Sequence, residues 1–75
     1  MNNYLIVTTT DSTGTFKDYI KLKYVESFAI SGDGERLSIT MRSGRQHFIS
    51  KKFSICEQNN QTINWDELPR VICNG

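Results

Sequence analysis

The chain has little of what most enzymes and metal proteins need. Its 75 residues include one histidine, His47, and two cysteines, Cys56 and Cys73. A zinc site uses about four ligands at a recognisable spacing, and these three residues do not supply one. No cofactor-binding or catalytic motif is present either. We therefore expect a non-enzymatic protein that holds no metal and no cofactor.

Long apolar runs are also lacking. No segment approaches the roughly 20 apolar residues of a membrane-spanning helix. The start of the chain, residues 1–4, lacks the basic and apolar regions of a signal peptide. The sequence therefore predicts a cytoplasmic protein without a membrane partner, in which the two cysteines remain reduced thiols.

The length limits what can be built. Residues 1–75 are enough for a single domain, because two useful cores cannot be assembled from so short a chain. An apolar share of 37 % and eight aromatic residues are sufficient for a folded core. The same side chains cannot also enclose a deep pocket, which counts against an enzyme that surrounds its substrate.

The firmest local prediction is a β-hairpin over residues 36–50. Residues 36–42 alternate strictly between polar and apolar, which is typical of a strand with one buried face. A two-residue turn at Ser43-Gly44 then leads into a returning strand, residues 45–50. This turn places Ile39 opposite Phe48 and Thr40 opposite His47. The core face would then hold Leu37, Ile39, Met41 and Phe48, and the outer face would hold Ile49 with the charged side chains.

The other segments favour strands as well. Residues 4–9 form an apolar, β-branched run, residues 18–24 alternate, and the apolar stretch 24–30 is expected to pair with 36–42. A helix across residues 16–28 is the alternative for the second segment, because Phe16, Ile20, Tyr24 and Phe28 recur every four residues. Strands are preferred there because β-branched and aromatic residues are frequent.

The tail is less regular. Residues 53–56 fit a strand or the start of a short helix. Asn64 and Glu67 have the spacing of a helix start, Pro69 limits that helix to about one turn, and residues 70–73 fit a last strand. The predicted fold is mainly β: a small antiparallel meander, or a strongly bent sheet or small barrel, of five to six short strands with one short helical turn near the C-terminus.

Charge is unevenly distributed. Residues 1–35 hold three lysines against five acids, residues 36–56 hold five basic residues and no acid, and residues 57–75 hold one arginine against three acids. The predicted hairpin would gather the basic side chains of the middle segment on one face. Arginine offers a planar fork of donors to carboxylates and phosphates. The predicted partner-binding residues are Arg36, Arg42, Arg45, His47 and Lys51.

These features predict a small protein-binding module: an adaptor, subunit or inhibitor of a larger protein or complex with an acidic surface. Its size and simplicity suit a phage or mobile-element inhibitor of host defence. Pairing of strand edges could also join copies of the chain. The plain alternative is a solvated strand face, whose charges only prevent aggregation.

A nucleic-acid-binding module using the same basic face is the second functional hypothesis. Such modules interleave aromatic rings with their cations, because bases stack on rings. The predicted register turns Phe48 inward and leaves only His47 and Tyr19 outside. Nucleic acid therefore ranks behind a protein partner.

Overall fold

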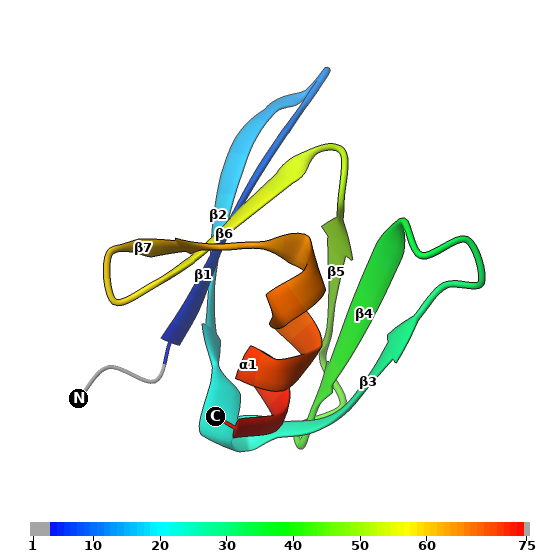
Figure 1. The fold of residues 1–75 in the computed structure, drawn as a ribbon, viewed down its shortest axis with the longest axis vertical. Coiled ribbons are helices and arrows are strands. Elements are labelled where there is room, and N and C mark those ends of the chain that lie inside the picture. Colours follow the sequence, from blue (N-terminus) through cyan, green and yellow to red (C-terminus); the bar gives the residue numbers. More distant parts are fainter. Residues whose placement is uncertain (1–3, 75) are drawn as a thin grey trace.

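In the computed structural model, which describes residues 4–74, seven strands form two antiparallel sheets (Figure 1). The four-stranded sheet has the order β2 (Gly14–Lys21), β1 (Tyr4–Asp11), β6 (Ser54–Gln58) and β7 (Gln61–Ile63). The three-stranded sheet has the order β3 (Val25–Ile30), β4 (Arg36–Met41) and β5 (Gln46–Ser50). The predicted mainly β, antiparallel fold is confirmed, with seven strands among the described residues in place of the expected five to six. Within the described residues the two sheets do not close into a barrel.

The chain passes from the first sheet to the second through one 3-10 turn, η1 (Leu22–Tyr24), which follows β2 directly. The preference for strands over a helix in this region is confirmed, since β2 and β3 account for all but that turn. The predicted pairing of 24–30 with 36–42 is also confirmed, because β3 pairs antiparallel with β4. Leu22 is buried and helps to fix the turn against the core.

The core lies between the two sheets and is almost entirely aliphatic. Its buried members are Leu5, Val7, Ile20, Leu22, Leu37, Ile39, Ile49, Cys56, Leu68 and Ile72. Of the eight aromatic residues, only Phe28 and Trp65 pack against this cluster, and the other six are exposed.

The C-terminal segment is helical, so the predicted strand at 70–73 and the predicted limit of about one helical turn are both wrong. A 3-10 turn, η2 (Trp65–Glu67), runs directly into α1 (Leu68–Asn74). Pro69 lies in the first turn of α1, where a helix does not need the N–H that proline lacks. The expected pairing of Asn64 with Glu67 is present at the start of η2.

The segment η2–α1 covers the opening between the two sheets (Figure 1). Leu68 and Ile72, one helical turn apart, enter the core, and the Trp65 indole N–H donates to the Gly34 carbonyl at 3.0 Å. None of the helices within residues 4–74 is long and apolar enough to span a membrane.

The 36–50 hairpin is present, but its register differs by one residue from the prediction. The Gly44 N–H donates to the Met41 carbonyl at 2.9 Å, and the Met41 N–H donates to the Arg45 carbonyl at 2.8 Å. These bonds define a three-residue loop, 42–44, with Gly44 at φ 92°. A two-residue turn would require positive φ at Ser43 too, which a serine side chain disfavours.

The extra loop residue reverses the two faces of β5, because side chains alternate along a strand. His47 lies opposite Ile39, and Phe48 lies opposite Ser38. Ile49 is therefore in the core at 2 % exposure, and Phe48 is outside at 69 %. The predicted inward Phe48, outward Ile49 and outward His47 are all wrong, whereas Leu37 and Ile39 are core residues and Met41 packs against the core, as predicted.

Candidate functional site

Three of the five predicted site residues line one groove. Arg42, Arg45 and His47 form one wall of a groove of about 610 Å³, and residues 17–21 of β2 form the other. Tyr24, at the end of η1, closes the groove between them. We call this the basic groove, defined by Lys17, Asp18, Tyr19, Ile20, Lys21, Tyr24, Met41, Arg42, Ser43, Arg45 and His47.

A backbone hydrogen bond and a strand pair join the arginine wall to the segment that follows β2. The Arg42 N–H donates to the Tyr24 carbonyl at 2.8 Å, which fastens the 42–44 loop to the turn that follows β2. The Val25–Met41 pair begins the three-stranded sheet at the same place. The positions of Arg42 and Arg45 are thus set by the main chain, although both side chains are exposed.

The groove runs along the edge of β2 and not across one face of its sheet. Five consecutive residues, 17–21, line it, and consecutive strand residues point to opposite faces. β2 is the terminal strand of its sheet and pairs only with β1. Alternate residues of β2 therefore present backbone N–H and C=O groups to the groove.

The groove has a strongly positive lining. Its charged members are four cations, Lys17, Lys21, Arg42 and Arg45, and one carboxylate, Asp18. No ion pair within 4.0 Å involves any of these side chains among residues 4–74. Four cations without carboxylate partners in one groove favour an anionic occupant.

The tyrosine at the end of the groove already contacts cations. The Lys21 and Lys23 amino groups lie 5.2 and 5.3 Å from the centre of the Tyr24 ring. Tyr19, on β2, is 59 % exposed and has no such partner among the described residues. Ammonium groups at these distances attract the ring electrostatically and help to keep the lysine side chains near the groove.

Arg36 and Lys51 lie elsewhere. Arg36 is six residues before Arg42 on an extended strand, a separation of about 20 Å. The Lys51 amino group lies 3.9 Å from the Glu35 carboxylate, and the Lys51 N–H donates to the Glu35 carbonyl. The prediction that all five side chains share one surface is therefore wrong. Their part in binding a partner stays a prediction.

The β2 wall of the groove was not predicted from the sequence. A signal for it was present, because Lys17, Tyr19 and Lys21 occupy alternate positions, the spacing that brings strand side chains to one face. The count of charges in residues 1–35 hid it, since five acids outweigh three lysines there. Only the fold brings this segment against the 42–44 loop.

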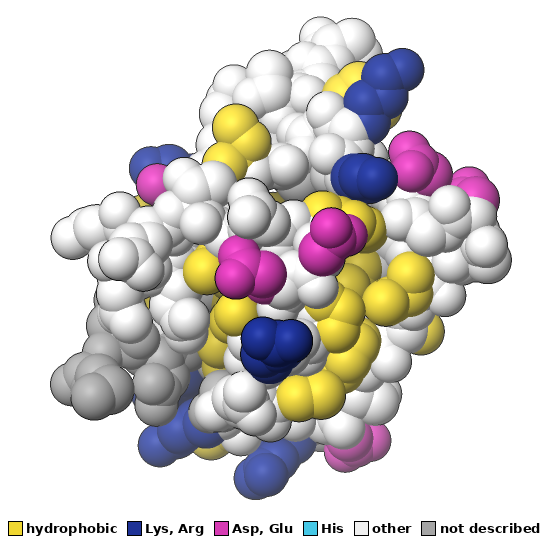
Figure 2. All heavy atoms as spheres, viewed as in Figure 1, with side chains coloured by type: hydrophobic (Ala, Val, Ile, Leu, Met, Phe, Trp, Pro, Cys, Tyr) yellow, Lys and Arg dark blue, Asp and Glu magenta, His cyan; other side chains and the backbone are white. Residues whose placement is uncertain are grey.

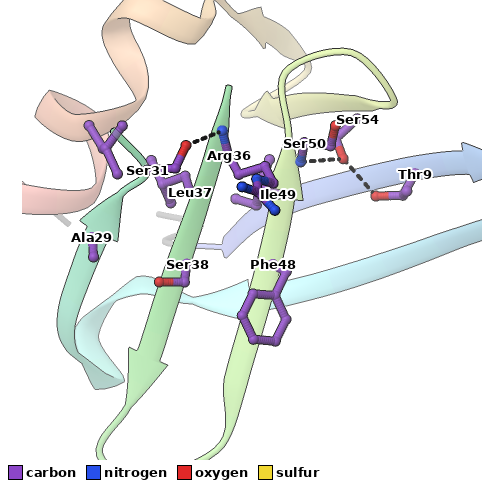
Figure 3. Close-up of a pocket in the computed structure, with 11 residues that line it drawn as sticks. Thr9, Ala29, Ser31, Arg36, Leu37, Ser38, Phe48, Ile49, Ser50 and Ser54 are labelled. Atoms are coloured by element: carbon purple, nitrogen blue, oxygen red, sulfur yellow. Dashed lines mark hydrogen bonds between the residues drawn. The ribbon is translucent and has the colours of Figure 1, made fainter. Parts of the chain in front are cut away.

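A second, apolar groove of about 370 Å³ lies on the outer face of the three-stranded sheet. In it Ser38 and Phe48 lie side by side on β4 and β5, near Ala29 and Arg36 (Figure 3). The hydroxyls of Thr9 and Ser54, 2.8 Å apart, lie at its far end. The inward placement of Phe48 in the predicted register concealed this surface.

The face around α1 is mixed in charge. Figure 2 shows hydrophobic side chains gathered around the helix, with Lys, Arg, Asp and Glu side chains interspersed. Lys and Arg side chains also appear along the lower edge of this view, the region where Figure 1 places the end of β2 and the 42–44 loop. Interspersed charges of both signs do not select an anionic partner, so the basic groove is the stronger candidate.

The two cysteines do not form a reactive pair. Cys56 is buried in the core, and burial raises the pKa of its thiol to about 11, so the nucleophilic thiolate is scarce at neutral pH. Cys73 is exposed on α1. Among residues 4–74 no three His, Cys, Asp or Glu side chains are grouped as a metal site would need.

Comparisons with models of protein families, with curated proteins and with solved structures gave no match. The geometry and charge of the basic groove are therefore the main guide to what the protein binds. That groove combines cations from two distant segments with an open strand edge.

Proposed function

We propose that the chain is a non-enzymatic protein-binding module whose basic groove takes an acidic segment of a larger protein. The observation that supports this most is the meeting of Lys17 and Lys21 with Arg42 and Arg45 around one groove. Clustered cations speed the encounter with an acidic surface and select against basic ones. Arginine and tyrosine are also the residues that most often dominate binding energy at interfaces.

The role we propose is that of an adaptor, subunit or inhibitor that acts by occupying its partner. Inhibition of a host defence protein by a phage or mobile-element product is the specific form we favour. The exposed aromatic residues support a binding role, because six rings outside the core add nothing to it. Catalysis has no comparable support among the described residues.

Single-stranded nucleic acid is the second candidate, and one observation favours it. Tyr19 and Tyr24 lie among the cations of the groove, which meets the condition that bases need rings on which to stack. Two features favour protein instead. The Tyr24 ring already contacts two lysines, and the whole chain carries a net charge of only +1.

The test begins with affinity capture of the partner from the cell of origin and its identification by mass spectrometry. The affinity of the purified partner is then measured for the double variant Arg42→Glu/Arg45→Glu. Loss of two cations and gain of two carboxylates in the groove should weaken binding by more than tenfold, about 1.4 kcal/mol. Circular dichroism checks that the variant remains folded.

The matched control is Arg36→Glu/Lys51→Glu, which makes the same change in net charge outside the basic groove. It should bind within about twofold of the wild type. Equal losses in both variants would show that total charge matters and not the groove. A gel shift with a single-stranded oligonucleotide at low salt tests the second candidate, for which affinity must fall steeply as salt rises.

A further inference from the structure

The four terminal strands of the two sheets differ in how their edges are protected. β7 has only three residues, and β3 has a register shift between Val25 and Ser27. β5 has five residues, and its last residue is tied to β6 where the Ser50 N–H donates to the Ser54 hydroxyl. Short length, irregular pairing and coverage are the usual means of blocking an open edge.

β2 has none of these three, and only its lysines discourage pairing, by repelling another edge of like charge. It has eight residues, pairs with β1 in unbroken register from Gly14 to Lys21, and lacks proline. Within the described residues no backbone hydrogen bond joins β2 to any strand except β1. The basic groove follows residues 17–21 of this edge, a length of about 17 Å, which suits an extended segment of about five residues.

We propose that an acidic segment of the partner protein adds to β2 as a further antiparallel or parallel strand of the four-stranded sheet. This inference rests on the proposed function and specifies how the partner is held. Main-chain hydrogen bonds to β2 would supply affinity, and side chains at alternate positions would supply specificity. A nucleic acid cannot make these bonds, so this mode requires a protein.

The two faces of β2 define the sequence that fits. Lys17, Tyr19 and Lys21 share the outer face, whereas Asp18 and Ile20 share the inner face, where Ile20 is buried in the core; Met41 also lines the groove. An added strand would place acidic residues beside the lysines and apolar residues toward Ile20. The preferred segment therefore alternates acidic and apolar residues. The same lysines repel the β2 edge of a second copy, so the occupant is a different protein.

The experiment uses a synthetic acetylated and amidated peptide of alternating Glu and Val, six residues long. Two further peptides of the same sequence carry backbone N-methyl groups, one on all Glu residues and one on all Val residues. In an extended peptide each set of amides points to one edge, so only one of the two can block pairing with β2. All three have the same charge and side chains, and calorimetry gives their affinities.

We expect one methylated peptide to bind at least tenfold more weakly than the parent and the other to bind like the parent. Hydrogen exchange of β2 amides should slow only with the peptides that bind. Equal binding of all three peptides would overturn strand addition and leave capture by charge intact. No binding of any peptide would count against the proposed function itself, and strand addition would be lost with it.

Discussion

The register of the hairpin is most directly tested by truncating two neighbouring side chains, Phe48 and Ile49. Ile49 is 2 % exposed and packs in the core, so Ile49→Ala removes buried methyl groups and leaves a cavity. Such changes cost about 2–5 kcal/mol. Phe48 is 69 % exposed, so Phe48→Ala should change the free energy of unfolding by no more than about 0.5 kcal/mol.

Urea denaturation followed by circular dichroism measures both values. A domain of this length has a total stability of roughly 4–11 kcal/mol, so Ile49→Ala could unfold a large fraction of the molecules. Ile49→Val, with an expected loss of about 1 kcal/mol, keeps the comparison measurable. A two-residue turn would bury Phe48 instead. Loss of stability in Phe48→Ala with none in Ile49→Val would therefore refute the register.

Three further predictions concern the loop, the helical cap and the thiols. Gly44→Val should lower the melting temperature by about 4–8 °C, because a β-branched residue at φ 92° is strained by about 1 kcal/mol. A Cβ at this position would meet no neighbouring atom, so the backbone strain is the whole effect. An unchanged melting temperature would contradict the loop geometry. Trp65→Phe should cost about 1 kcal/mol through the lost hydrogen bond to the Gly34 carbonyl, measured in urea, and a neutral result would show that the bond contributes nothing. At pH 8 a thiol reagent should modify Cys73 in the native protein and Cys56 only after unfolding. Because burial raises the pKa of Cys56 from 9.0 to about 11, stability should fall as pH rises across that interval, and this component should be missing in Cys56→Ala.

The alternation of residues 36–42 was enough to predict a strand and its core face, because a period of two has one structural meaning. The number of residues in the turn could not be predicted in the same way. Gly44 suits the αL position of both a two-residue and a three-residue loop, and one residue of difference reverses every side chain of β5. In contrast, Asn59 and Asn60, at φ 54° and 65°, form a two-residue turn between β6 and β7, because asparagine tolerates this conformation.

The tail and the groove were harder for different reasons. Residues 70–73 include β-branched residues that suit a strand. The segment is a helix in the fold, and the helix places both Leu68 and Ile72 in the core. The groove depends on contact between segments about 25 residues apart in the sequence, Lys17–Lys21 and Met41–Arg45. No local pattern encodes that meeting. It follows from η1, which redirects the chain from one sheet to the other.

Binding in the basic groove is tested by a map of amide chemical-shift changes when the Glu-Val peptide is titrated into the isotope-labelled protein. If the peptide occupies this groove, the largest changes will fall on residues 17–21 and 41–47, with residues 36 and 51 unaffected. Changes centred on Phe48 and Ala29, in the apolar groove, would contradict it. So would changes of similar size spread over all the basic residues.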